Sequence, residues 1–296
     1  MASRSDTPVP DLSGQVVLIT GGNSGIGKEA AVELATMGAT VAITARSQTK
    51  GAAALDEIRQ RSGSQAVEVV ALDLADFASI RGCAADVLDR HDRLDVLVNN
   101  AGGILSDRLV TAQGFEMSFG VNHLGHFLLT DLLRERLVAS SPARVITVAS
   151  IGHRFAIGGL SFSDLQSEHR YWSMDAYGKS KLANILFTRE LARRLAGTGV
   201  TANCLHPGVV RTGFGSADDT SGVERLTMAL TAPFYIGAAR GARTTVYLAS
   251  SPEVAGRTGG YYVRCREHRP SRAARDDEAA RRLWEVSEEL VASVPA

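Results

Sequence analysis

The sequence predicts an α/β fold, in which a doubly wound parallel sheet lies between two layers of helices. Two observations predict it. Short apolar runs of strand length recur along the chain, and segments of helical composition separate most of them. The first run is also followed at once by a glycine-rich turn that opens a helix. Strands and helices in this alternation imply right-handed βαβ crossovers, and therefore a three-layer αβα arrangement.

Each expected element follows from its own composition. The strands are mainly apolar runs, and the first is a continuous one, as expected of a strand that is buried on both faces of a sheet. They cover residues 15–20, 40–44, 67–72, 95–98, 145–149 and 200–205. The helices run from the glycine turn to about residue 37, and over 51–61, 77–91, about 114–138, 175 to about 195 and about 273–291. No repeat, low-complexity tract or clear linker divides the 296 residues, so they are interpreted as a single domain.

The composition argues against several classes of protein. The net charge is zero and there is no basic block, so nothing favours nucleic acid or an anionic membrane as a partner. The three cysteines, Cys83, Cys204 and Cys265, lie far apart and predict neither a disulfide framework nor a metal site. Residues 1–13 are expected to be a flexible tail, and no apolar run suits a signal peptide or a membrane anchor. A cytoplasmic location is the resulting expectation.

A glycine-rich turn, residues 20–27, joins the first strand to the first helix. Glycines let the backbone approach phosphate groups, and a helix N-terminus supplies free N–H groups and a positive dipole end. In this context the turn predicts a pyrophosphate cradle, and residues 14–296 are interpreted as a dinucleotide-binding catalytic domain. The residues expected to hold the cofactor here are Gly21, Asn23, Ser24, Gly25, Ile26 and Gly27.

The end of the second strand bears on the choice of cofactor. In a dinucleotide-binding fold this end faces the adenosine ribose, where NAD enzymes usually place an acidic residue. The sequence has no acid there. It has Arg46, which is suited to pair with a 2′-phosphate, and Lys28 follows the glycine turn. Each cation alone is compatible with a solvated surface position, but together with the missing acid they favour NADP over NAD.

Tyr177 and Lys181 are four residues apart on an expected helix that Asp175 is suited to cap. Both side chains therefore leave one face of the helix, whereas Lys179 is interpreted as solvated. A neighbouring positive charge favours phenolate, so Lys181 is expected to lower the pKa of Tyr177 from its usual value of about 10. A tyrosine tuned in this way exchanges a proton with an alcohol oxygen near neutral pH. Such a pair by itself is more often a solvated helix face, so its interpretation depends on the rest of the chain.

Further motifs occur in a fixed order, and with them the chain resembles the short-chain dehydrogenases/reductases over residues 12–294. The matching residues are Thr20-Gly21-x-x-x-Gly25-Ile26-Gly27, Asn99-Asn100-Ala101-Gly102, Ser150, Tyr177-x-x-x-Lys181 and Pro207-Gly208. Residues 119–127, 181–191 and 279–284 look like the retinol-dehydrogenase-like branch of that family. The resemblance implies a Rossmann-type fold and an oxidoreductase.

The resemblance also implies a role for each catalytic match. Tyr177 would be the general acid/base that protonates a carbonyl oxygen, and Lys181 would lower its pKa and hold the nicotinamide ribose. Ser150 would bind the substrate oxygen, and Asn122 would position a water molecule that links Lys181 to solvent. The carboxyl ends of parallel strands meet at one edge of a sheet, so these groups are expected in one crevice. The remaining expected cofactor contacts are Arg46, Asp73, Leu74, Asn100, Ala101, Gly102, Tyr177, Lys181, Pro207, Gly208, Val210 and Thr212.

Two segments outside the regular alternation, residues 151–174 and 209–236, are expected to form loops that determine the substrate. Their apolar and aromatic residues suggest a lipophilic pocket, although such residues also pack loops against a domain. The C-terminal helix is expected to cover the substrate end or a subunit edge. His123, His126 and His153 are assigned to the structure, because none has the spacing of a ligand or of a partnered base.

The leading interpretation is an NADP(H)-dependent oxidoreductase that interconverts an alcohol and a carbonyl on a lipophilic small molecule. The alternative is a non-catalytic, cofactor-binding sensor or scaffold, against which the four intact catalytic positions argue. An epimerase or dehydratase of the extended branch ranks last, because its glycine spacing differs. The helices around Asn122 and Tyr177 are apolar on most sides, and the family commonly pairs them across a two-fold axis, so a homodimer or homotetramer is expected.

Overall fold

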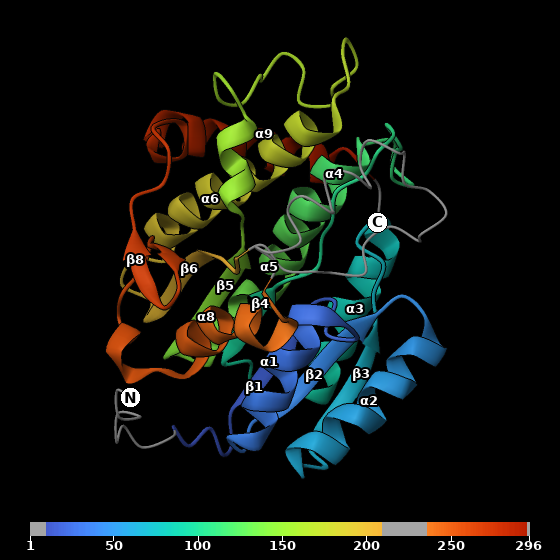
Figure 1. Ribbon diagram of the computed structural model, residues 1–296, viewed down its shortest axis with the longest axis vertical. Helices are drawn as coiled ribbons and strands as arrows, with labels where there is room; N and C mark the ends of the chain where they lie inside the picture. The colour runs from blue at the N-terminus through green and yellow to red at the C-terminus, as the bar shows by residue number, and fades with distance from the viewer. Residues whose placement is uncertain (1–9, 209–235, 295–296) are drawn as a thin grey trace.

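All described strands belong to one sheet. The structure is a computed structural model that describes residues 10–208 and 236–294. The sheet has the order β3-β2-β1-β4-β5-β6-β7-β8, and neighbouring strands run parallel except for β7 and β8. Figure 1 shows β3 and β8 at opposite edges of this sheet. The strands are β1 (Val16–Ile19), β2 (Thr40–Ala45), β3 (Val67–Ala71), β4 (Val96–Asn99), β5 (Ala143–Val148), β6 (Val200–His206), β7 (Tyr261–Val263) and β8 (Arg266–His268).

Helices cover both faces of the sheet, which confirms the predicted α/β fold class. Leu18 of β1 belongs to the apolar core under α3, α5 and α6, whereas its neighbours Val17 and Ile19 belong to the core under α1, α2 and α8. This alternation explains why β1 is apolar without interruption. The helices are α1 (Gly25–Thr36), α2 (Gln48–Ser62), α3 (Phe77–Arg90), α4 (Met117–Phe119), α5 (Gly125–Ala139), α6 (Ser173–Arg194), α8 (Ala238–Ser250) and α9 (Asp277–Ala292).

The strand order reverses between β1 and β4, and this reversal positions the site. From β1 the chain builds outward through β2 to β3, and it then returns to place β4 on the other side of β1. In sheets of this kind a crevice forms beyond the carboxyl ends of the two strands that flank the reversal. The glycine turn and the turn at residues 99–102 both lie at these ends.

The helix expected over residues 114–138 is interrupted. It begins with α4, because the Glu116 carboxylate caps the N–H groups of Ser118 (2.8 Å) and Phe119 (2.7 Å). A π-helical segment, Gly120–Leu124, then separates α4 from α5. Single π-helical turns are rare inside helices and frequent at functional sites, and this one contains Asn122.

The helix that carries Tyr177 begins two residues earlier than expected. Its N-cap is Trp172, so Asp175 lies in the first turn of α6 instead of capping it. Asp175 pairs with Lys179 at 2.7 Å, and the Lys179 side chain is only 18% exposed. The interpretation of Lys179 as a freely solvated cation is therefore wrong.

The C-terminal helix α9 covers α5 and α6 within the chain. Trp284 packs against Phe127 of α5, with ring centroids 4.9 Å apart, and stacks on Phe187 of α6 at 5.8 Å. Ser287 of α9 forms a hydrogen bond of 2.9 Å with His123. These are the apolar faces on which a homodimer or homotetramer was expected. They no longer support that assembly, which stays a prediction from the family resemblance.

The ends of the described ranges bear on two further expectations. Part of the expected tail, residues 1–13, is held by the fold, because Leu12 is buried and donates its N–H to the Met37 carbonyl at 2.8 Å. Residues 1–9 lie outside the described residues, and so do residues 209–235 of the expected substrate loop. No helix within residues 10–208 and 236–294 is long and apolar enough to cross a membrane.

Candidate active site

The glycine turn after β1 is joined to the turn after β4. The hydroxyl of Thr20 accepts hydrogen bonds from the N–H groups of Asn100 (2.8 Å) and Ala101 (3.0 Å). The Asn100 side-chain amide donates in turn to the Thr20 carbonyl at 2.8 Å. Thr20 is fully buried, so these bonds form without competition from water. The two turns therefore form one continuous edge of the crevice.

Two glycines in the first turn are required by the local backbone. Gly21 has a φ of +64°, which side chains disfavour. A Cβ on Gly27 would lie 2.6 Å from the Asn100 amide nitrogen and 2.7 Å from the Gly21 carbonyl oxygen, so a side chain would push the two turns apart. Ser24, the N-cap of α1, makes no side-chain cap, which leaves first-turn N–H groups available to an anion. This cradle fits a dinucleotide pyrophosphate.

The end of β2 carries one exposed cation. Arg46 directly follows Ala45, the last residue of β2, and is exposed. Lys28 on α1 pairs with Glu57 at 2.5 Å, so its charge is already compensated. A preference for a 2′-phosphate therefore depends on Arg46 more than on Lys28.

The turn after β3 is shaped by its own polar groups. The Asp73 carboxylate accepts the N–H of Ala75 at 3.0 Å, while the Asp73 N–H donates to the Ser79 hydroxyl at 2.9 Å. Leu74 is buried. Both residues follow the carboxyl end of β3, and their expected contact with a cofactor stays a prediction.

The Asn122 side chain connects the turn after β4 to α6. Its Oδ1 accepts the N–H of Gly103 at 3.0 Å, and its Nδ2 donates to the Gly103 carbonyl at 3.0 Å. The same Nδ2 donates to the Ser180 hydroxyl at 2.9 Å, and Ser180 donates to the main-chain carbonyl of Tyr177 at 2.8 Å. The expected role of Asn122 toward a water molecule stays a prediction, since its side chain is engaged by these protein groups.

Ser150 and Tyr177 meet at the turn that follows β5. Ser150 caps a short 3₁₀ helix, Ile151–Phe155, by accepting the N–H of Gly152 at 3.0 Å. A Cβ on Gly152 would lie 2.8 Å from the Tyr177 ring carbon Cε1, so glycine is what lets this turn pack against the phenol. That Cβ would also lie 3.3 Å from the Ser150 hydroxyl oxygen, so the hydroxyl and the phenol ring lie against the same glycine.

Burial dominates the titration of Tyr177. Burial raises the pKa of Tyr177 above its usual value, and the polar side chain of Ser150 opposes this rise. The Lys181 ammonium lies 5.8 Å from the centre of the Tyr177 ring and donates to the Val148 carbonyl at 3.0 Å. The expected lowering of the Tyr177 pKa by Lys181 is therefore wrong in this structure, because helical spacing predicts nearness but not the loss of water around the phenol.

Lys181 is itself perturbed by its surroundings. Its side chain is 4% exposed, and burial lowers the pKa of Lys181 to about 8. A Cβ on Gly102 would lie 3.4 Å from the Lys181 nitrogen, which places the ammonium directly beside the turn after β4. The structure thus brings Lys181, Tyr177, Ser150 and Asn122 together at the carboxyl edge of the sheet.

The segment after β6 is described only in part. Pro207 and Gly208 follow β6, and Gly208 has a φ of +98°. A Cβ on Gly208 would lie 2.5 Å from the Cδ1 atom of Ile236, so the chain approaches itself closely there. Val210 and Thr212, which were also expected to contact the cofactor, lie outside the described residues.

The apolar residues of segment 151–174 divide into two groups. Leu160 and Phe162 pack against the core under α6 and α9. Phe155, Ile157 and Trp172 are instead 44%, 85% and 56% exposed. The expected lipophilic lining therefore reduces, within the described residues, to an exposed apolar rim near the Ser150 turn.

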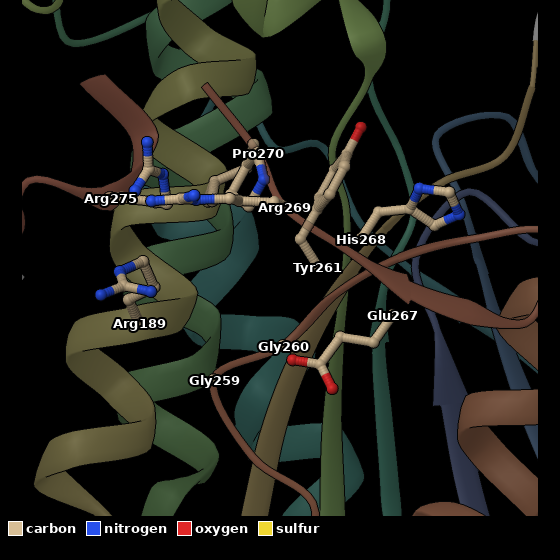
Figure 2. A pocket seen from close by; sticks show the side chains of 10 residues that line it. Arg189, Gly259, Gly260, Tyr261, Glu267, His268, Arg269, Pro270 and Arg275 are labelled. Atoms are coloured by element: carbon tan, nitrogen blue, oxygen red, sulfur yellow. The ribbon is translucent and has the colours of Figure 1, made fainter. Parts of the chain in front are cut away.

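A hollow of about 430 Å³ lies away from this site. Figure 2 shows it between Arg189 on α6, Tyr261 on β7 and Arg275 near the start of α9. Arg189 is three turns of helix beyond Tyr177, and none of the predicted site residues lines the hollow. We do not assign it to the substrate.

Sequence reasoning missed residues whose partners lie far away in the chain. Ser180 is one of them, because its link to Asn122 spans 58 residues. Gly152 and Gly178 are others: a Cβ on Gly178 would lie 2.9 Å from the Gly152 carbonyl, so both glycines allow α6 to approach the Ser150 turn. The one available signal was a glycine directly after Tyr177 and another two residues after Ser150.

The fold and the site first define a class of protein. A parallel sheet with a glycine cradle at its topological reversal, and a buried lysine with a half-buried tyrosine and serine beside it, is the arrangement of a dinucleotide-binding enzyme.

Comparison with known proteins narrows this class. The profile of the short chain dehydrogenase family matches residues 15–221. Retinol dehydrogenase 12 of Mus musculus is 48% identical over 280 residues, which cover 95% of this chain and 87% of that protein. An uncharacterized protein from Mycobacterium paratuberculosis has a solved structure with 38% identity and a TM-score of 0.76, and 95% of each chain is covered. The Pseudomonas aeruginosa RhlG/NADP active-site complex has 27% identity and a TM-score of 0.67, over 85% of this chain and 94% of that one.

The chain belongs to the short chain dehydrogenase family and is similar to its retinol dehydrogenases. It is therefore an oxidoreductase that acts on CH–OH groups, and its fold is one that binds NAD(P).

Proposed function

We propose that the chain is an NADP(H)-dependent oxidoreductase that interconverts an alcohol and a carbonyl on a lipophilic small molecule, with Tyr177 as general acid/base. One observation carries this proposal. The Ser150 hydroxyl and the Tyr177 ring both lie against Gly152, and the Lys181 ammonium lies 5.8 Å from the centre of that ring, next to the turn after β4. A proton donor, a second hydroxyl and a cation thus surround one position where a substrate oxygen can bind.

The residues of the chain handle the proton and the oxygen. A bound nicotinamide would supply the hydride chemistry, at the carbonyl carbon in reduction and at the alcohol carbon in oxidation. In reduction, Tyr177 donates its phenol proton to the carbonyl oxygen, and the phenolate that remains recovers a proton from solvent. Ser150 donates a hydrogen bond to the same oxygen, and the Lys181 ammonium stabilises the negative charge that develops there. Because burial raises the pKa of Tyr177, the phenol is protonated near neutral pH, which is the form that reduction needs.

The choice of NADP is supported by Arg46. It is the exposed cation at the end of β2, where an acid would otherwise bind the ribose hydroxyls. Glu57 compensates the charge of Lys28, so Arg46 is the group that we expect to pair with the 2′-phosphate.

A lipophilic substrate is supported by the rim of the site. Phe155, Ile157 and Trp172 expose apolar surface near the Ser150 turn. Tyr171 fastens this segment to the other side of the crevice by donating its hydroxyl to the Leu105 carbonyl at 3.0 Å. The relatives named retinol dehydrogenases point in the same direction, toward a long apolar alcohol or aldehyde.

A cofactor and substrate screen tests the proposal. The full chain is mixed with NADPH or NADH and with carbonyl compounds of four kinds: short aldehydes, long apolar aldehydes, retinaldehyde and ketones. We expect loss of the reduced-nicotinamide absorbance, fastest with NADPH and a long apolar aldehyde. The chain could instead bind NADPH tightly but reduce no carbonyl, and oxidise no alcohol with NADP. That result would support the non-catalytic sensor.

A further inference from the structure

We propose that His126 is a positioning residue that holds the glycine turn in register with the helix carrying Tyr177. His126 is the second residue of α5 and is 1% exposed. The inference rests on the proposed function, because it concerns the same site. It gives a role to a side chain that the sequence had assigned to structure alone.

Both ring nitrogens of His126 have defined partners. Nδ1 lies 3.1 Å from the main-chain carbonyl oxygen of Asn122, and Nε2 lies 2.9 Å from the hydroxyl of Thr20. A carbonyl oxygen only accepts hydrogen bonds, so Nδ1 carries the ring proton. Nε2 of the neutral ring is then an acceptor, and Thr20 donates its hydroxyl proton to it.

The Thr20 hydroxyl has a single consistent arrangement. Its proton is used on His126, and its oxygen accepts the N–H groups of Asn100 (2.8 Å) and Ala101 (3.0 Å). The competing acceptor, the Val98 carbonyl, is farther away at 3.3 Å and already accepts the Thr20 N–H at 3.0 Å. His126 is therefore bonded, through Thr20, to both turns that form the cofactor edge of the crevice.

The other side of His126 leads to Tyr177. The main-chain carbonyl of Asn122 accepts a hydrogen bond from His126 Nδ1. The side-chain amide of Asn122 donates to the Ser180 hydroxyl, which donates in turn to the main-chain carbonyl of Tyr177. The orientation of the Asn122 amide is fixed, because its oxygen and nitrogen both bond to the backbone of Gly103. One chain of buried and part-buried hydrogen bonds therefore joins the phosphate cradle to the catalytic helix, with His126 at its centre.

The chain of bonds requires a neutral imidazole. If Nε2 were also protonated, its N–H would point at the Thr20 hydroxyl. That hydroxyl would then lose Nε2 as its acceptor and would have to rotate away. Burial lowers the pKa of His126 to about 4, and the nearby Lys181 ammonium acts in the same direction, against the opposing effect of the bond to Asn122. The ring therefore stays neutral at the pH values at which Tyr177 is expected to work.

His123 provides a matched control in the same segment. It is also 1% exposed, and its Nε2 forms a hydrogen bond of 2.9 Å with the Ser287 hydroxyl. That bond leads to α9 and not to the cofactor site. Substituting His123 thus removes a buried imidazole and its bond while leaving the connection from Thr20 to Asn122 in place.

The experiment compares His126→Leu, His126→Gln and His123→Leu with the parent, at a temperature where circular dichroism shows all four folded. His126→Leu leaves the Thr20 hydroxyl and the Asn122 carbonyl without their buried partner, so we expect the Kd for NADPH to rise about tenfold or more and kcat to fall with it. The glutamine of His126→Gln offers an oxygen to Thr20 and should restore part of the NADPH affinity. His123→Leu should change neither parameter, although it loses stability. Equal effects of the two leucine variants on Kd and kcat, or none from His126→Leu, would overturn the proposal.

A second measurement does not depend on activity. Nitrogen-15 NMR of the folded parent, with its histidine ring signals assigned by the two leucine variants, should show the His126 proton on Nδ1 and an unprotonated Nε2 that accepts a hydrogen bond. A proton on Nε2 would overturn the proposal. If the parent turns over no carbonyl at all, the proposed function fails, while the NADPH affinities and the NMR signals still decide the role of His126.

Discussion

Replacing Lys181 by methionine is predicted to stabilise the fold while it removes activity. Lys181 is 4% exposed, and its ammonium donates to the Val148 carbonyl at 3.0 Å. Burial lowers the pKa of Lys181 from 10.5 to about 8, because the charged form loses its water. Methionine has a similar length and no charge, so Lys181→Met fills the same space without a buried ammonium.

The size of the effect follows from this pKa. A fall from 10.5 to about 8 corresponds to about 3 kcal/mol against the charged form in the folded state. The Val148 carbonyl keeps a second donor, the Asn184 amide at 3.3 Å, so it is not left without a partner. We therefore expect Lys181→Met to raise the free energy of unfolding by about 2–3 kcal/mol near neutral pH.

The gain should depend on pH in a known direction. Below about pH 8, both the folded and the unfolded parent carry the lysine charge, so the parent bears the whole cost of burying it. Between about pH 8 and pH 10.5, the folded parent has released the proton while the unfolded chain still binds it, so the stability of the parent rises with pH. The advantage of Lys181→Met should then shrink toward zero.

Urea unfolding, followed by tryptophan fluorescence near neutral pH and again at about pH 9.5, measures both effects. Lys179→Met is the matched control on the same helix, because Lys179 is more exposed and pairs with Asp175 at 2.7 Å. The fall in the free energy of unfolding caused by Lys179→Met should stay below about 1 kcal/mol, since partly exposed ion pairs contribute little. A Lys181→Met variant no more stable than the parent near neutral pH, or a gain that does not shrink as pH rises, would refute this explanation.

Three further substitutions test other parts of the molecule. Arg46→Asp should raise the Kd for NADPH about tenfold or more and weaken the preference for NADPH over NADH, because it puts an anion where the 2′-phosphate is expected. Equal affinity of the parent for both cofactors would contradict this. Gly152→Ala should lower kcat about tenfold or more with little change in the Kd for NADPH, because the new Cβ would lie 2.8 Å from the Tyr177 ring; an unchanged kcat would show that the turn gives way instead. Trp284→Ala should cost about 3–5 kcal/mol in urea unfolding, because α9 loses its contacts with Phe127 and Phe187; a loss below about 1 kcal/mol would show that α9 is not held by this side chain.

The sequence predicts those parts of the fold whose signal is local. Strands β1 to β6 are mainly apolar runs, and β1, β2 and β4 are buried along nearly all of their length. Strands β7 and β8 have three residues each, which is too short for any periodicity, and they form by pairing with β6 and with each other. The π-helical turn at residues 120–124 has no compositional signal, because it differs from an α-helix only in which carbonyl each N–H meets.

The candidate site divides in the same way. Ser150, Tyr177 and Lys181 occupy recognisable positions, and the structure brings them together. The direction of the Tyr177 pKa was missed, because the burial comes from the Gly152 turn, 25 residues earlier in the chain. His126 was taken as purely structural, because its partner Thr20 is 106 residues away and no local pattern relates them.

Tyr177→Phe tests the central claim most directly, because it removes one oxygen and keeps the ring that packs against Gly152. Turnover is measured by the reduced-nicotinamide absorbance at saturating NADPH, with the best carbonyl substrate of the parent, and NADPH affinity is measured separately by fluorescence. Tyr247→Phe is the control, because this α8 side chain donates its hydroxyl to the Glu253 carboxylate at 3.0 Å, outside the catalytic cluster. We predict that Tyr177→Phe lowers turnover by roughly 100-fold or more, the scale of a lost general acid, and leaves NADPH affinity nearly unchanged. Turnover at the rate of the parent would show that another group supplies the proton, and would contradict the proposed mechanism.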